Sequence, residues 1–203
     1  MSGSSTVLLE MEEARPKVTF ASIRERNANK QPQLTRLLGD VHDVALLEIS
    51  CGTGAHIMEI LASKSGSVVW GVEDKPDNLL AAFSLNQFAI RSNRCQIVDA
   101  DLAHLPFSDG MFAVVYSVNQ FHTWTNRWET LREARRVLTP GGILVLSLRV
   151  KGQTWLTCGG EDISVTKDVL DWLTRDGWKV LYAELASCSS ISDEFWIKVQ
   201  RID

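Results

Sequence analysis

An apolar run that passes through a glycine-rich turn into a helix is the feature that most restricts how this chain can fold. Residues 44–49 read Val-Ala-Leu-Leu-Glu-Ile, residues 50–54 read Ser-Cys-Gly-Thr-Gly, and residues 55–63 carry apolar side chains at helical spacing. A short, nearly continuous apolar run is typical of a strand buried on both faces, as in a parallel sheet. The sequence therefore predicts a strand, a tight turn and a helix in direct succession.

The same alternation continues along the chain. The hydrophobic pattern next predicts strand 67–72, helix 77–90, strand 96–98, strand 112–118, helix 127–138, strand 143–148, helix 166–175, and strands 179–185 and 195–199. Strands that alternate with helices form a parallel sheet covered on both faces, whereas two strands joined by a loop pair antiparallel. We therefore expect a three-layer, doubly wound α/β fold around a mixed sheet whose last strand runs against the others.

One domain is expected, because 203 residues of which 45% are hydrophobic can bury a single core large enough to fold. Residues 1–18 begin rich in Ser and Gly and should form a flexible N-terminus, and residues 19–203 should form the domain. Its expected parts are an N-terminal helical segment at 19–40, a ligand-binding core at 44–148, and a C-terminal helix and strand pair at 149–203.

Charge and cysteine content exclude several classes of function. The formal net charge of -4 gives no overall positive field to attract phosphate backbones, so a nucleic-acid partner is not favoured. No apolar stretch is long enough to cross a bilayer. The four cysteines are Cys51, Cys95, Cys158 and Cys188, and their spacing is not that of a metal site or a disulfide framework. We therefore expect no bound metal and a reducing, cytoplasmic location.

The turn after the first strand is a candidate ligand site, because open α/β sheets bind ligands beyond the carboxyl ends of their strands. Gly52 and Gly54 lack side chains, so the backbone can turn sharply and approach a ligand closely. A tight turn without a ligand is the alternative. The dinucleotide pattern G-x-G-x-x-G fails at Ile57, and a nicotinamide cofactor is therefore not favoured.

Acidic residues stand at the ends of the first three strands. Glu48 ends a buried strand and needs a cationic ligand or backbone N–H groups to offset its desolvation. Glu73 could accept hydrogen bonds from both hydroxyls of a ribose, and Asp74 beside it could do the same or cap the next helix. Asp101 could accept from an adenine amino group with Leu102 over the ring, or it could bond its own backbone.

These residues lie in motifs that resemble those of the class I S-adenosylmethionine-dependent methyltransferases, in particular the type 11-like group. The matching motifs occur in order at 47–54 (LEISCGTG), 71–76 (GVEDKP), 101–107 (DLAHLPF), 108–115 (SDGMFAVV) and 136–142 (RVLTPGG). The resemblance covers about half of the chain. It implies a mostly parallel seven-stranded sheet with an antiparallel last strand, and S-adenosylmethionine as the cofactor.

The resemblance also implies roles for particular residues. The backbone from Ser50 to Gly54 would hold the methionine part of the cofactor, Glu73 its ribose, and Asp101 with Leu102 its adenine. Ser117 and Asn119, at the end of the fourth strand, would lie near the sulfonium. The resemblance thus assigns cofactor binding to Glu48, Ser50, Gly52, Gly54, Glu73, Asp74, Asp101, Leu102, Ser117 and Asn119.

Two residues depart from the motifs of the family, and one further segment resembles a second group of methyltransferases. Ser50 stands where the family usually has its first glycine, and Ala113 stands where it usually has an aspartate. The segment Glu25-Arg26-Asn27 resembles another methyltransferase group in which E-R-N precedes the first strand, and there Arg26 would reach the carboxylate of the cofactor.

The expected reaction is in-line transfer of a methyl group to a small molecule or to an exposed protein side chain. His122 is the candidate for taking a proton from the acceptor, or it is a loop histidine bonded to backbone. Trp124 and Trp128 could wall an acceptor pocket, although packing is the preferred interpretation. The enzyme could rely on a partner subunit to cover its site. A non-catalytic adaptor that works through protein contacts is the alternative function, which Ser50 and Ala113 keep open.

Overall fold

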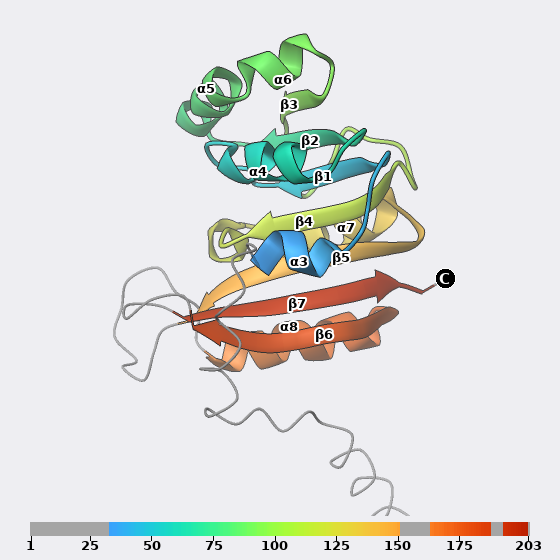
Figure 1. The fold of residues 1–203 in the computed structure, drawn as a ribbon. Helices are drawn as coiled ribbons and strands as arrows, with labels where there is room; N and C mark the ends of the chain where they lie inside the picture. Colours follow the sequence, from blue (N-terminus) through green and yellow to red (C-terminus); the bar gives the residue numbers. More distant parts are fainter. Residues whose placement is uncertain (1–32, 151–162, 188–192, 203) are drawn as a thin grey trace, which may run out of the picture. The chain divides into compact units, whose positions relative to one another are not determined.

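The strands predicted from the hydrophobic pattern assemble into one sheet in a computed structural model of the chain (Figure 1), which describes residues 33–150, 163–187 and 193–202. The described residues belong to one compact unit, Gln31–Asp203. The predicted flexible segment 1–18, Arg26 and most of the helical segment 19–40 lie outside the described residues. None of the described helices is both long and apolar enough to span a membrane.

The described elements agree with the predicted alternation of strands and helices. In chain order they are α3 (Gln33–Leu38), β1 (Ala45–Ile49), α4 (Ala55–Ser63), β2 (Val68–Glu73), α5 (Pro76–Leu85), α6 (Gln87–Arg91), β3 (Cys95–Asp99), β4 (Phe112–Val118), the short 3-10 helix η2 (Phe121–Thr123), α7 (Arg127–Val137), β5 (Leu138–Val150), α8 (Ile163–Arg175), β6 (Trp178–Ser187) and β7 (Asp193–Arg201).

The seven strands are ordered β3-β2-β1-β4-β5-β7-β6. Strands β1 to β5 pair in parallel, and β7 pairs antiparallel with both β5 and β6. This confirms the expected seven-stranded sheet with an antiparallel last strand. The strand order reverses between β1 and β4, so the crevice at which such sheets bind ligands lies beyond the carboxyl ends of these two strands.

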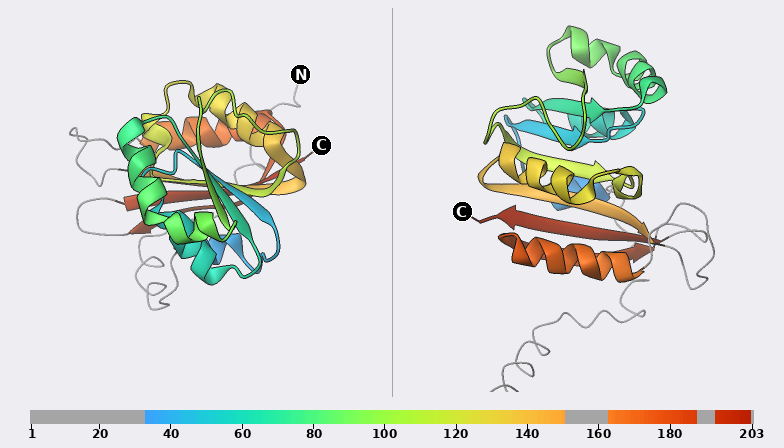
Figure 2. Two further views of the ribbon diagram at one scale, coloured as in Figure 1. Left: turned by 90° about the horizontal axis from the view of Figure 1, so that it is seen from above. Right: turned by 180° about the vertical axis from the view of Figure 1, so that it is seen from behind.

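Helices cover both faces of the sheet, which makes the three layers (Figures 1 and 2). Successive side chains of a strand point to opposite faces. Thus Leu46 of β1 joins the core beneath α3, α4 and α5, while Leu47 joins the core beneath α7 and α8. The two cores fix the position of the glycine turn between β1 and α4.

The helix predicted at 77–90 is interrupted at Asn86, which separates α5 from α6. The buried Asn86 side chain donates from Nδ2 to the carbonyl oxygens of Ala82 (3.0 Å) and Gly54 (3.1 Å). An asparagine side chain that bonds backbone carbonyls competes with helical hydrogen bonding, which accounts for the break. The same amide ties the start of α6 to the glycine turn.

The fifth strand begins at Leu138, earlier than the predicted 143, because the proline and glycines at 140–142 form an irregularity inside the strand rather than a turn before it. Leu138 pairs with Phe112 and Ile143 pairs with Val114, so the register shifts between these pairs. Gly141 has φ +72°. Proline and glycine within a strand are typical of such a bulge.

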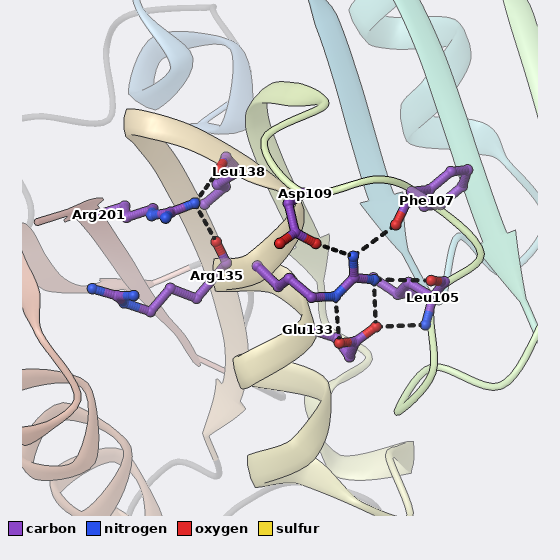
Figure 3. A network of polar contacts seen from close by, with 8 residues as sticks. Leu105, Phe107, Asp109, Glu133, Arg135, Leu138 and Arg201 are labelled. Atoms are coloured by element: carbon purple, nitrogen blue, oxygen red, sulfur yellow. Dashed lines mark hydrogen bonds and ion pairs between the residues drawn. The ribbon is translucent and has the colours of Figure 1, made fainter. Parts of the chain in front are cut away.

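Arg136 ties two of the sequence motifs together at the amino edge of the parallel strands, and Figure 3 shows the residues that it bonds, Leu105, Phe107, Asp109 and Glu133. Its guanidinium donates to both carboxylate oxygens of Glu133, to Asp109, and to the backbone carbonyls of Leu105 and Phe107. These contacts raise the pKa of Arg136 and lower that of Glu133. Arg136 therefore holds the 101–107 loop against α7.

Candidate active site at the carboxyl edge of the sheet

The glycine turn adopts the backbone conformation that its composition predicts. Gly52 and Gly54 have φ values of +55° and +75°, in the left-handed region that glycine enters without a steric cost. A Cβ atom at Gly52 would lie 3.6 Å from Nε2 of Gln120, an ordinary contact, so the left-handed backbone and not a steric clash favours glycine here. Gly54 is the N-cap residue of α4, whose first backbone N–H groups lie at this edge.

Glu73 ends β2 and is fully buried (0% exposed). Its Oε2 accepts a hydrogen bond from the backbone N–H of Gly52 (2.8 Å), and its Oε1 accepts from the N–H groups of Asp74 and Lys75, both at 3.1 Å. A carboxylate offers about four acceptor positions, so one position at Oε2 is left for a further donor. Glu73 therefore joins the glycine turn to the end of β2.

Ser50 occupies a conformation that favours glycine. Its φ is +55°, and its buried hydroxyl has no hydrogen-bond partner in the part of the chain that the structure describes. A left-handed backbone costs a residue with a Cβ atom about 1–2 kcal/mol. This explains why a glycine at this position is the usual residue in the family that the motifs resemble.

Replacement of Ser50 by glycine should therefore stabilise the protein by about 1 kcal/mol, since it removes the strain and an unpartnered hydroxyl, less the entropy that glycine adds to the unfolded chain. Chemical denaturation would measure the change. Asn93→Gly is the matched control, because exposed Asn93 also has a positive φ (57°) but asparagine tolerates it better. Equal changes in the two variants would contradict this account of Ser50.

Glu48 has a partner that the sequence analysis did not find. Its Oε1 lies 3.3 Å from Nδ1 of His56, in the first turn of α4. Burial raises the pKa of Glu48, and the contact with Glu48 raises that of His56. Among the described residues, Glu48 is thus offset by a histidine and not by the backbone N–H groups considered from the sequence.

The end of β4 carries a second polar group of contacts. Asn119, with φ +55°, accepts from the Ser147 hydroxyl (2.9 Å) and donates from Nδ2 to Oε1 of Glu194 (2.6 Å). Trp196 donates its indole N–H to the other oxygen of Glu194 (3.0 Å). Ser117 is buried two residues earlier. Ser147, Glu194 and Trp196 come from β5 and β7, distant in sequence, so no local pattern indicated them.

The residues proposed for adenine lie at the end of β3 but make contacts of their own. Asp101 is exposed and accepts from the backbone N–H of Ala103 (2.9 Å) and from Nδ1 of His104 (2.8 Å). Leu102 is buried in the core beneath α7 and α8. Asp74 is exposed, and the N-cap position of α5 is Lys75 rather than Asp74.

The residues proposed near the acceptor divide between packing and backbone contacts. Trp124 is buried beside Phe121, with ring centroids 5.1 Å apart, and Trp128 stacks on Trp172 at 5.3 Å. The preferred interpretation of both tryptophans as packing residues agrees with these contacts. His122 lies in η2, where its carbonyl oxygen accepts from Arg127 (3.2 Å). Ala113 packs partly buried against the core beneath α3, α4 and α5.

Four buried side-chain atoms on β1, on β4 or in the turn after β1 have no hydrogen-bond partner among the described residues, although the two on β4 belong to successive residues and so point to opposite faces of the sheet. They are Glu48 Oε2, Ser50 Oγ, Tyr116 Oη and Ser117 Oγ. Unpartnered buried polar groups are rare in native proteins, because each costs free energy. The Ser50 hydroxyl belongs to the glycine turn itself, so it fits a polar ligand at this crevice. No described residues form a cluster suited to a metal ion.

Comparisons with known proteins agree with this arrangement. Residues 47–146 match the profile of the family described as "Methyltransferase domain". The chain is 26% identical over 176 residues to cycloartenol-C-24-methyltransferase of Arabidopsis thaliana, covering 79% of this chain and 52% of the relative. It is 33% identical over 101 residues to 27-O-demethylrifamycin SV methyltransferase of Amycolatopsis mediterranei (strain S699), covering 50% of this chain and 37% of the relative.

A solved structure of a SAM-dependent methyltransferase from Aquifex aeolicus has the same fold, with a TM-score of 0.69 at 13% identity, over 92% of this chain and 100% of that one. The chain spans about half the length, or less, of the two curated relatives. The family match covers the glycine turn, Glu73 and the motifs joined by Arg136. The chain is thus a member of the class I S-adenosylmethionine-dependent methyltransferases.

Proposed function

We propose that this chain is an enzyme that transfers the methyl group of S-adenosylmethionine to a small molecule or to an exposed protein side chain. The observation that carries the proposal is the left-handed glycine turn, bonded to Glu73 and carrying the unpartnered buried hydroxyl of Ser50, at the point where the strand order reverses. The match of residues 47–146 to a methyltransferase family supports it.

The residues of the crevice suit the parts of that cofactor. The backbone at Ser50–Gly54 would bind the methionine part, and the open acceptor position on Glu73 would bind a ribose hydroxyl. The buried hydroxyl of Ser117 and the side chain of Asn119 would lie toward the reacting end. The adenosine part would contact Asp101, Leu102 and Asp74. Only the positions of these residues after β3 and β2 support this assignment.

The reaction needs positioning more than a reactive side chain. The cofactor supplies a methyl group on a sulfonium that is already a good leaving group. The protein therefore has to orient the acceptor in line with that methyl group and to exclude water. The two cores hold the ends of β1 and β4 rigidly, which suits this task.

A small-molecule acceptor is the first candidate, because both curated relatives described above are named as methyltransferases of small molecules. We propose the cytoplasm as the compartment, and the free, buried thiols of Cys51 and Cys95 are consistent with it. Burial raises the pKa of Cys95 to about 11, so this thiol is not a nucleophile near neutral pH.

Isothermal titration calorimetry with S-adenosylmethionine, S-adenosylhomocysteine and NADH tests the cofactor assignment. The first two should bind and NADH should not. Methyl-labelled S-adenosylmethionine, added with a small-molecule extract or with a protein extract, then shows where the label goes. Cofactor binding without labelling of either extract would favour the adaptor alternative, and failure of both cofactor forms to bind would exclude the proposed function.

A further inference from the structure

The pair of Glu48 and His56 lies inside the proposed site, and although the resemblance assigns Glu48 to the cofactor, no part of the cofactor was matched to this pair above. Glu48 is on β1, one residue before the strand ends, and His56 is in the first turn of α4, two residues after Gly54. The Glu48 side chain is 1% exposed, whereas that of His56 is 38% exposed. The pair therefore reaches from the buried sheet to the accessible edge.

The contact between the two side chains fixes the orientation of the imidazole. Nδ1 of His56 faces the Glu48 carboxylate at 3.3 Å, so this nitrogen carries the proton when Glu48 is ionised. Nε2 then holds the free lone pair. A carboxylate that orients a histidine in this way is the usual means by which proteins present a histidine as a base.

The charged groups around His56 favour proton uptake. Glu48 from β1 is the largest influence and raises the pKa of His56; Glu59 from α4 and Glu194 from β7 raise it further, while partial burial lowers it. Tyr116 from β4 neighbours Glu48 and lowers the pKa of that carboxyl, against the larger effect of burial. No cation among the described residues contributes to the shift.

A purely structural ion pair explains these observations less well. One oxygen of Glu48 is buried without a partner, and so is the hydroxyl of Tyr116. A buried carboxylate with a single partner is usually no more stabilising than an apolar side chain of the same size. The pair also shares its edge of the sheet with Asn119 and Glu194, which lie after β4 and at the start of β7.

We propose that His56, oriented by Glu48, accepts the proton of the methyl acceptor, which is therefore a molecule with an ionisable O–H, N–H or S–H group. This inference rests on the proposed function. As the acceptor oxygen, nitrogen or sulfur forms its bond to the methyl carbon, the carbon–sulfur bond breaks and its electron pair stays on sulfur. The proton leaves the acceptor atom for Nε2 of His56, and the product cofactor is neutral at sulfur.

Two probe acceptors separate a base from a structural residue. Phenol is largely un-ionised at about pH 8 and needs a base, whereas thiophenol is largely ionised and does not. We expect His56→Gln to slow methylation of phenol by about 100-fold and that of thiophenol by less than about 3-fold, because general-base catalysis contributes about 100-fold or more. His42→Gln is the matched control: His42 also lies 2.9 Å from a carboxylate, that of Asp43, but before β1 begins.

The pH dependence gives a second readout. His56 accepts a proton only when neutral, so phenol methylation should rise with pH through the pKa of His56, which Glu48 holds above the ordinary 6.5. In Glu48→Gln, both this midpoint and the His56 titration followed by NMR should move to lower pH. Glu48 acts here as a positioning residue, and glutamine keeps its size.

Several results would overturn the inference while leaving the proposed function intact. In each, calorimetry shows that the cofactor binds normally. The first such result is an equal loss of methylation rate for phenol and thiophenol in His56→Gln. The second is a His56 titration that does not change in Glu48→Gln, and the third is the absence of phenol methylation by the unmodified protein. If the cofactor does not bind the unmodified protein, the proposed function itself fails.

Discussion

Replacement of Glu73 by alanine should weaken the binding of S-adenosylmethionine by about 100-fold or more. The side chain is fully buried, and its carboxylate links the N–H of Gly52 to the start of α5 through Asp74 and Lys75. Hydrogen bonds to a charged group are worth about 1.5–3 kcal/mol each, and the loss of about 3 kcal/mol corresponds to about 100-fold in affinity. Isothermal titration calorimetry measures the change.

Asp74→Ala provides the control for this prediction. The two carboxylates are adjacent in sequence, but Asp74 is exposed and Glu73 is buried. We expect the affinity of Asp74→Ala to stay within about 5-fold of the unmodified protein, in line with the modest worth of exposed polar contacts. If the affinity for S-adenosylmethionine fell in Asp74→Ala and not in Glu73→Ala, Asp74 and not Glu73 would be the residue that binds the ribose.

Gly54→Ala should destabilise the protein by about 2–5 kcal/mol and abolish cofactor binding. A residue with a Cβ atom at φ +75° costs about 1–2 kcal/mol. The added Cβ would also lie 2.4 Å from Nδ2 of Asn86, which could move away only by giving up its hydrogen bonds to Gly54 and Ala82. Overpacking of this kind costs about 1–3 kcal/mol. Urea denaturation and calorimetry measure the two effects.

Gly39→Ala separates backbone strain from the steric clash. Gly39 has φ +71°, close to that of Gly54, but a Cβ there would meet no atom within 4 Å. It should therefore lose only about 1–2 kcal/mol and keep its affinity for the cofactor. If both variants lost the same stability, the contact with Asn86 would have no role in the effect of Gly54→Ala.

The fold could be predicted from the sequence wherever local pattern and global structure agree. Strand β4 and helix α4 have the predicted bounds, because their apolar residues repeat without interruption. Two of the differences in extent have tertiary causes. Asn86 ends α5, and its side chain donates a hydrogen bond to the carbonyl oxygen of Gly54, 32 residues away in the sequence. The bulge at 140–142 depends on the pairing of β5 with β4.

The candidate site could be predicted only where it is continuous in sequence. The glycine turn and Glu73 follow from their places at the ends of strands, and the structure places them in contact through Gly52. His56 was not among the predicted site residues, because a single helical position says nothing about a partner on the strand beneath it. Glu194 reaches Asn119 only because β7 pairs with β5, which local sequence cannot show.

The place of β7 in the strand order has a consequence for how the chain is made on the ribosome. Strand β6 is synthesised before β7, yet it pairs with the sheet through β7 alone. Until residues 193–201 have emerged, β6 has no neighbouring strand to bond, and the edge of β5 stays open to other chains. Completion of the sheet is therefore one of the last events of folding, because it requires β7, which lies between β5 and β6 in the finished sheet.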